Sequence, residues 1–276
     1  KREIDWITST LTIPKIHNIP IVLSKEFDGE IRTVTISRTS TNKYFASVLV
    51  ETTDNIIVAP ISSRAVGIDL GIKDFATLSD GTVINNPRHL AKNLKKLKRE
   101  QRRLSRKKKG SKNRDKQRKK VAKTHEKVSN CRKDFLHKIT HQIVKNQDYN
   151  SVAIEDLNVC EILKNGKKNR LSRNIADVGW GMFKQFLTYK CERAGKNLLV
   201  IGRFEPSSKL CTCGYLNSSL TLKDREWDCP SCLTHHKRDE LAAKNIKRFA
   251  FCKQNTNKDK NLVPKEFREF MPLEIC

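Results

Sequence analysis

Residues 65–71 read Ala-Val-Gly-Ile-Asp-Leu-Gly, an apolar run that a single acid interrupts. A short apolar run between turn residues predicts a buried strand. Residues 74–84, Asp-Phe-Ala-Thr-Leu-Ser-Asp-Gly-Thr-Val-Ile, predict a hairpin that turns at Asp80-Gly81. Apolar patterns farther along predict two more strands and two helices, at 151–157, 197–204, 177–194 and 237–251. This mixture of strands and helices predicts an α/β core.

Three acidic residues occupy the ends of these predicted elements. Asp69 and Glu155 lie inside apolar strands, and Asp239 precedes the apolar start of the last helix. A carboxylate among strand apolars is unfavourable unless it is paired or binds a cation. If the three converge, they can hold two Mg²⁺ ions, which activate a water and stabilise the leaving oxygen in phosphodiester hydrolysis. The alternative is that each acid is an edge residue or a salt-bridge partner, which is our expectation for Asp156.

Four of the nine cysteines fall within 22 residues: Cys211, Cys213, Cys229 and Cys232. Two pairs of thiolates at this separation predict a zinc ribbon, although the first pair has one intervening residue and not two. His235 and His236 lie close by and are either substitute ligands or exposed side chains. Disulfides are the alternative, but the scattered remaining cysteines are typical of thiols in a reducing compartment.

The charge of the chain is concentrated in one segment. The 276 residues contain 56 Lys and Arg against 30 Asp and Glu, a formal net charge of +26. Residues 91–133 hold 21 of the basic residues and three acids, which is +18 of that charge. Such a segment favours a polyanionic partner, and nucleic acid is the usual one. No apolar run approaches the ~18 residues of a membrane span.

Leucines recur at helical spacing through the basic segment, and Gly110-Ser111 interrupts it. We therefore predict two antiparallel helices over about 91–147 with a basic tip that contacts phosphates. The alternative is a solvated helix pair that happens to be basic. The candidate nucleic-acid contacts, with two arginines near Asp239, are Lys95, Lys96, Arg99, Arg102, Arg103, Arg106, Lys107, Lys108, Lys112, Arg114, Arg118, Lys119, Arg225 and Arg238. Trp180, Phe183 and Phe186 are interpreted as core residues and not as base-stacking ones.

The two ends of the chain differ from this core. Residues 29–59 alternate in the manner of strands, and a proline-containing stretch before them predicts an edge strand. Together they predict a small β-rich, barrel-like unit that ends near Pro60. The first residue is Lys1 and not Met, so a truncated front is expected. The last residues are expected to form a polar tail.

Five sequence blocks occur in a fixed order: GIDLGIKDFATLSDG, AIEDLNV, FEPSSKLC with a following CG, LTLKDREWDCPSC, and HHKRDELAAKNI. This set resembles the signature of TnpB, the OrfB-type "transposase" of insertion sequences, an RNA-guided nuclease family related to type V CRISPR effectors. The resemblance covers about residues 29–246. It implies an RNase H-like RuvC nuclease domain, with a zinc ribbon inserted before its last helix and a β-barrel wedge domain in front. The expected parts are the end of the wedge at 1–60, the RuvC core with its basic hairpin at 61–210, the ribbon at 211–236, the last RuvC helix at 237–252 and the tail at 253–276.

The resemblance also implies a function for each candidate site. Asp69, Glu155 and Asp239 become the RuvC carboxylates that bind Mg²⁺, and the four clustered cysteines hold a structural Zn²⁺. The implied partners are a guide RNA and a target DNA, in the cytoplasm of a prokaryote at its nucleoid. The expected activity is RNA-guided, metal-dependent DNA cleavage.

Two alternatives to this activity come from the same features. The first is a non-cleaving, nucleic-acid-binding protein: the absent front and the shortened first cysteine pair favour a truncated remnant, whereas the three intact carboxylates argue against a repressor. Lys237 is a further departure, because the family often has an acid at this position. A cut-and-paste DDE transposase also carries its acids on an RNase H fold, but the ribbon before the last acid argues against it.

Overall fold

The computed structural model describes residues 3–52, 56–62, 64–159, 161, 170–203, 205–221 and 223–255. The chain divides into two compact units. The first comprises Lys1–Asn55 and Lys96–Glu126, and the second comprises Ile56–Lys95 and Lys127–Cys276.

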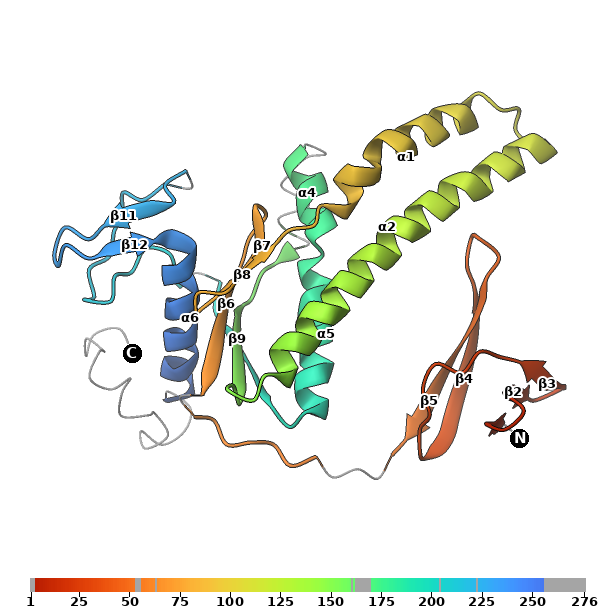
Figure 1. The fold of residues 1–276 in the computed structure, drawn as a ribbon, viewed down its shortest axis with the longest axis horizontal. Helices are drawn as coiled ribbons and strands as arrows, with labels where there is room; N and C mark the ends of the chain where they lie inside the picture. The colour runs from red at the N-terminus through yellow and green to blue at the C-terminus, as the bar shows by residue number, and fades with distance from the viewer. Residues whose placement is uncertain are drawn as a thin grey trace. The chain divides into compact units, whose positions relative to one another are not determined.

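A five-stranded sheet forms the centre of the second unit (Figure 1). Three strands run parallel to one another, in the order β10-β9-β6, and an antiparallel hairpin, β7-β8, extends the sheet beside β6. The strands are β6 (Ala65–Leu70), β7 (Asp74–Leu78), β8 (Val83–Asn85), β9 (Ser151–Glu155) and β10 (Asn197–Ile201). The strands and the hairpin that the sequence predicts in this region are confirmed, and the parallel neighbours are joined by helical crossovers.

Helices cover both faces of this sheet (Figure 1). On one face, Val66, Ile68 and Ile154 pack against the C-terminal half of α2 (Lys112–Lys145), α4 (Arg170–Val178) and α5 (Trp180–Arg193). On the other face, Ala153 and residues of β10 pack against α6 (Arg238–Asn255). The α/β core is therefore layered, with the larger apolar cluster on the α5 side.

Two helix boundaries differ from the sequence prediction. The helix predicted over 177–194 is broken at Gly179, which has φ 77°, so α4 ends at Val178 and α5 begins at Trp180. Trp180 and Phe183 of α5 are buried in the core, as expected. The last helix runs from Arg238 to Asn255, beyond the start predicted for the polar tail, and residues 256–276 lie outside the described residues.

Gly67 allows α6 to lie directly against the sheet. A Cβ at this position would be 2.1 Å from the carbonyl oxygen of Ala243 and 2.7 Å from the backbone nitrogen of Lys247. Both atoms belong to the backbone of α6, so they cannot move aside as a flexible side chain would. The close approach of strand and helix therefore requires glycine here.

The first unit contains two further sheets and the tip of a helical hairpin. β1 (Glu3–Asp5), β2 (Thr10–Ile13) and β3 (Ile16–Pro20) form an antiparallel sheet, and β4 (Glu30–Arg38) pairs with β5 (Tyr44–Glu51). Within residues 3–52 the strands form these two separate sheets, so the barrel-like wedge remains a prediction. The tip belongs to α1 (His89–Ser105) and α2, which flank the predicted break at Gly110-Ser111 and lie side by side (Figure 1).

Candidate functional site

Asp69 and Glu155 lie at the ends of adjacent parallel strands. Ile68 of β6 pairs with Ile154 of β9, so the two acids that follow are neighbours across the strands. Side chains alternate along a strand, and Asp69 therefore shares the face of Gly67 while Glu155 shares the face of Ala153. That face is the one covered by α6. The register of the sheet thus places both carboxylates beneath the same helix.

Asp239 reaches this place from the first turn of α6. Ala243 of the helix lies against Gly67, and Asp239 is one turn earlier, about 6 Å along the helix axis. Asp69 is two residues beyond Gly67, about 6.6 Å along the strand. Asp69 and Asp239 therefore lie at the same end of the sheet. The negative charge of Asp239 contributes to the raised pKa of Asp69.

The electrostatics of this end of the sheet are dominated by its acids. Burial, followed by the negative charges of Glu155 and Asp239, raises the pKa of Asp69 to about 7. Burial also raises the pKa of Glu155, although the Ser207 hydroxyl donates a 2.6 Å hydrogen bond to its Oε1 and opposes the rise. A bound cation would offset this excess negative charge and favour the ionised form of the carboxylates.

The carboxylates are grouped less tightly than the cysteines. We compared groups of three or more His, Cys, Asp and Glu side chains among the described residues. The four cysteines are the one such group whose metal-ligand atoms all lie within 4.8 Å of one another. Arg225 donates from Nη1 to both carboxylate oxygens of Asp239, at 3.3 and 3.2 Å. Asp156, next to Glu155, pairs instead with Lys184 at 2.8 Å and with Arg203 at 3.1 Å, which is the structural role expected for it.

The four cysteines named from the sequence form a compact cluster. The Cys211 and Cys232 sulfurs are 3.5 Å apart, and those of Cys213 and Cys229 are 3.6 Å apart. A tetrahedral zinc with bonds of about 2.3 Å to sulfur requires separations of about 3.8 Å, so the donor set fits Zn²⁺. No disulfide joins these four cysteines or any other cysteine within the described residues, so the disulfide alternative finds no support there.

Little apolar material holds the cysteine cluster in place. Its core consists of Cys211 and Cys229 with Leu220, Trp227 and Leu241. Two short strands, β11 (Glu226–Asp228) and β12 (His235–Lys237), pair antiparallel beside it. Leu241 belongs to α6, so the small core is anchored on the helix that also carries Asp239.

The two neighbouring histidines have different environments. His235 is exposed, and its Nδ1 is 2.8 Å from Asp228 Oδ1. His236 is 7% exposed, and its Nε2 lies 3.0 Å from Cys211 Sγ. The expected exposure is confirmed for His235 and wrong for His236, which is buried because it faces the cluster from the next strand position.

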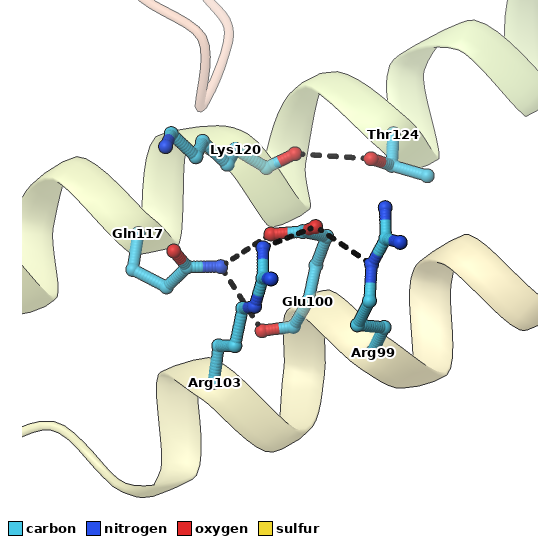
Figure 2. Close-up of polar contacts among 6 residues, drawn as sticks. All are labelled: Arg99, Glu100, Arg103, Gln117, Lys120 and Thr124. Carbon is cyan, nitrogen blue, oxygen red and sulfur yellow. Dashed lines mark hydrogen bonds and ion pairs between the residues drawn. The ribbon is translucent and has the colours of Figure 1, made fainter.

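The helical hairpin contains a buried acid that the sequence interpretation missed. Glu100 is 6% exposed and accepts a 2.7 Å hydrogen bond from Gln117 Nε2, which also donates to the Glu100 carbonyl oxygen (Figure 2). The hydrogen bond from Gln117 lowers the pKa of Glu100, and the positive charges of Arg103 and Arg99 lower it further. The available signal was spacing, because Glu100 is three residues after the buried Leu97 and so lies on the apolar stripe of α1.

The candidate basic contacts fall into two groups. Arg114 donates to the carbonyl oxygens of Leu104 and Lys107, at 3.0 and 3.2 Å, and so closes the end of α1. Arg99 and Arg103 lie 3.5 and 3.4 Å from Glu100, while Arg238 donates to the Thr221 carbonyl oxygen at 3.0 Å. The remaining hairpin candidates are exposed along the two helices and the loop that joins them: Lys95, Lys96, Arg102, Arg106, Lys107, Lys108, Lys112, Arg118 and Lys119. None of the described helices has the length and apolar character to cross a membrane.

Comparison with known proteins identifies the chain. Residues 47–166 match the family OrfB_IS605, described as "Probable transposase", and residues 180–246 match "Cas12f1-like, TNB domain". A Streptomyces pristinaespiralis protein named "Putative RNA-guided DNA endonuclease" is 46% identical over 219 residues, which cover 79% of this chain and 52% of that protein. The chain belongs to the TnpB family.

A second relative supports membership of the TnpB family. The Escherichia coli (strain K12) protein named "Putative RNA-guided DNA endonuclease InsQ" is 33% identical over 256 residues, which cover 88% of this chain and 63% of that protein. The chain thus spans 52% and 63% of the lengths of these two relatives. A solved cryo-EM structure of a CRISPR-Cas12f ternary complex matches with a TM-score of 0.48 and 19% identity, over 78% of this chain and 44% of that one.

Proposed function

We propose that this TnpB-family chain carries the nuclease part of an RNA-guided, Mg²⁺-dependent DNA endonuclease. The observation that carries the proposal is the meeting of Asp69, Glu155 and Asp239 at one end of the sheet, where burial and then the charges of Glu155 and Asp239 raise the pKa of Asp69 to about 7. The mixed sheet with helices on both faces supports an RNase H-like RuvC domain. The names of the relatives support a nuclease that is guided by RNA.

The carboxylates suit Mg²⁺ because they are hard oxygen donors in a site with excess negative charge. When bound, a pair of such ions supplies an activated water and stabilises the leaving oxygen of the cleaved phosphodiester. The chain itself contributes the positions of the ligands. β6 and β9 fix Asp69 and Glu155 by register, Ser207 orients Glu155, and α6 brings Asp239.

The basic hairpin and the cysteine cluster have supporting roles in this proposal. The exposed lysines and arginines of α1 and α2 bind the phosphates of the guide RNA or of its duplex with DNA, which provides affinity with little sequence information. The cysteines hold a structural Zn²⁺ that orders the ribbon on α6. The proposed partners are therefore a guide RNA and a target DNA in a prokaryotic cell, at the nucleoid.

The proposal is tested by plasmid cleavage with the longest natural version of the protein, RNA transcribed from its own locus and Mg²⁺. Asp69→Ala should reduce cleavage by at least about 10³-fold, because it removes a ligand needed only for the chemistry. RNA binding should stay within twofold of the parent. The matched control is Asp156→Asn, which changes the adjacent acid that pairs with Lys184 and Arg203.

Each outcome of this assay has a separate meaning. Cleavage that survives Asp69→Ala would refute the assignment of the carboxylates. A parent protein that binds the RNA tightly but never cuts would instead favour the non-cleaving, nucleic-acid-binding alternative.

A further inference from the structure

His236 is a buried polar side chain of the ribbon that faces the cysteine cluster without belonging to it. Its Nε2 lies 3.0 Å from Cys211 Sγ, and both residues are almost completely buried. The four sulfurs all lie within 4.8 Å of one another and already supply the four ligands that a structural Zn²⁺ takes. His236 therefore contacts a ligand and does not fill a vacant ligand position.

Cys211 is one of the two fully buried cysteines of the cluster, so its thiolate depends on hydrogen-bond donors from the protein. Four thiolates around one Zn²⁺ leave a net charge of −2, and a buried thiolate is costly unless N–H or O–H groups donate to it. Cys232 is exposed, and the Thr234 hydroxyl lies 3.2 Å from its sulfur. Cys211 is fully buried; the backbone N–H of Cys213 donates to its sulfur, and the Thr212 hydroxyl is 3.8 Å away.

The cysteine spacing explains why a side chain fills this role. Only Thr212 separates Cys211 from Cys213, so the first pair lacks the two-residue turn that Cys229 and Cys232 have. The ring of His236 is held from the opposite strand, since His236 pairs with Trp227 in the β11–β12 register and their rings are 4.9 Å apart. The donor is thus fixed in place by strand pairing.

We propose that His236 is a positioning residue of the ribbon, whose Nε2–H donates to the Cys211 thiolate and compensates for the shortened cysteine pair. This inference rests on the proposed zinc centre. It assigns His236 to the second layer around the metal, where it orients a ligand, neutralises part of its charge and tightens metal binding.

The test is zinc affinity of the full chain, measured by competition with a chromophoric chelator. His236→Phe keeps a ring but removes the N–H, and should weaken Zn²⁺ binding about 10- to 100-fold. His236→Gln retains a donor and should recover part of the loss. The matched control, His235→Phe, changes the exposed neighbour and should stay within about twofold of the parent.

Cobalt spectra separate the proposed role from direct ligation. Co²⁺ bound to the parent and to His236→Phe should give the same four-thiolate absorption, because the ligand set is unchanged. A spectrum of three sulfurs and one nitrogen in the parent would overturn the proposal, and so would unchanged zinc affinity in His236→Phe. A parent chain that binds neither Zn²⁺ nor Co²⁺ would instead refute the zinc centre itself.

A last variant tests the compensation. Insertion of one glycine after Thr212 restores the two-residue spacing of the first pair. In that background, His236→Phe should cost less than threefold in zinc affinity. An equal loss in both backgrounds would show that His236 does not substitute for the missing turn. Amide exchange of β6 and β9 reports whether each variant is folded, independently of the metal.

Discussion

The carboxylate end of the sheet and the cysteine cluster differ in what brings their ligands together. Asp69 and Glu155 are fixed by the register of two buried parallel strands, and Asp239 by the packing of α6 on Gly67. The cysteines lie on loops around a small core of Leu220, Trp227 and Leu241. The carboxylates are therefore held in place by the large core of the unit, whereas the cysteines have little apolar packing of their own.

This difference has an energetic consequence. The carboxylates repel one another, so the fold maintains their positions against an electrostatic cost that a cation would remove. The cysteine loop is too small to gain much from apolar burial, so we expect metal binding to supply much of its folding free energy. The acidic site should therefore survive metal removal, and the ribbon should not.

The largest expected effect is the loss of ribbon structure when zinc is removed. Structural zinc in small domains contributes roughly 10–16 kcal/mol of apparent binding energy. A strong chelator should lower amide protection in β11 and β12 by more than about 100-fold and leave β6 and β9 protected. Hydrogen exchange with mass spectrometry measures both regions in one sample. An equal loss of amide protection in β6 and β9, or no loss in β11 and β12, would contradict the proposed difference between the acidic site and the ribbon.

A second prediction concerns how the core places Asp239. Gly67→Ala puts a methyl group against the backbone of α6 and should destabilise the unit by roughly 3 kcal/mol or more, as an overpacked core does. Thermal unfolding measures the loss, and cleavage should fall as the helix shifts. Gly181→Ala, on α5 with open space around it, should change stability by less than about 1 kcal/mol. Similar effects of the two variants would argue against a close approach of α6 at Gly67.

The cost of assembling the acids should appear in the pH dependence of stability. The pKa of Asp69 is about 7 in the fold against 3.8 for the free side chain, so the folded state binds the proton more tightly and loses stability as pH rises between these values. Asp69→Asn should then stabilise the metal-free protein at pH 8 by on the order of 4 kcal/mol and have little effect at pH 4.

Chemical denaturation at the two pH values is the measurement for Asp69→Asn. The gain at pH 8 should disappear when Mg²⁺ is added, because only the parent is stabilised by the cation. A variant that is less stable than the parent at pH 8 would show that the acids are not in electrostatic conflict.

The smallest predicted effect is at Ser207, which donates to Glu155. Ser207→Ala should cost about 1 kcal/mol and raise the pKa of Glu155, since it removes the hydrogen bond that favours the charged form. The acid limb of the cleavage pH profile should move to higher pH. Ser219→Ala, which loses only an exposed bond to Asn217, should leave the profile unchanged.

The sequence predicts the parts of the molecule that depend on local patterns. The apolar runs around Asp69 and Glu155, the Asp80-Gly81 turn and the cysteine spacing are all local, and the strands and the cluster appear where they indicate. The features that were missed depend on contacts between distant elements. The break at Gly179 was hidden in a continuous apolar stripe, and the burial of Glu100 depends on Gln117 of the other helix. His236 differs from His235 only because strand pairing turns it toward Cys211.

The most direct test of the central claim is binding of Mn²⁺, a paramagnetic substitute for Mg²⁺, followed by electron paramagnetic resonance. The zinc-loaded parent should bind Mn²⁺, and Glu155→Gln should weaken this binding by at least about tenfold. Asp156→Asn, which changes the neighbouring acid that pairs with Lys184 and Arg203, should leave the binding unchanged. Equal Mn²⁺ binding by the parent and Glu155→Gln would contradict the claim that the carboxylates at the end of the sheet form a single cation site.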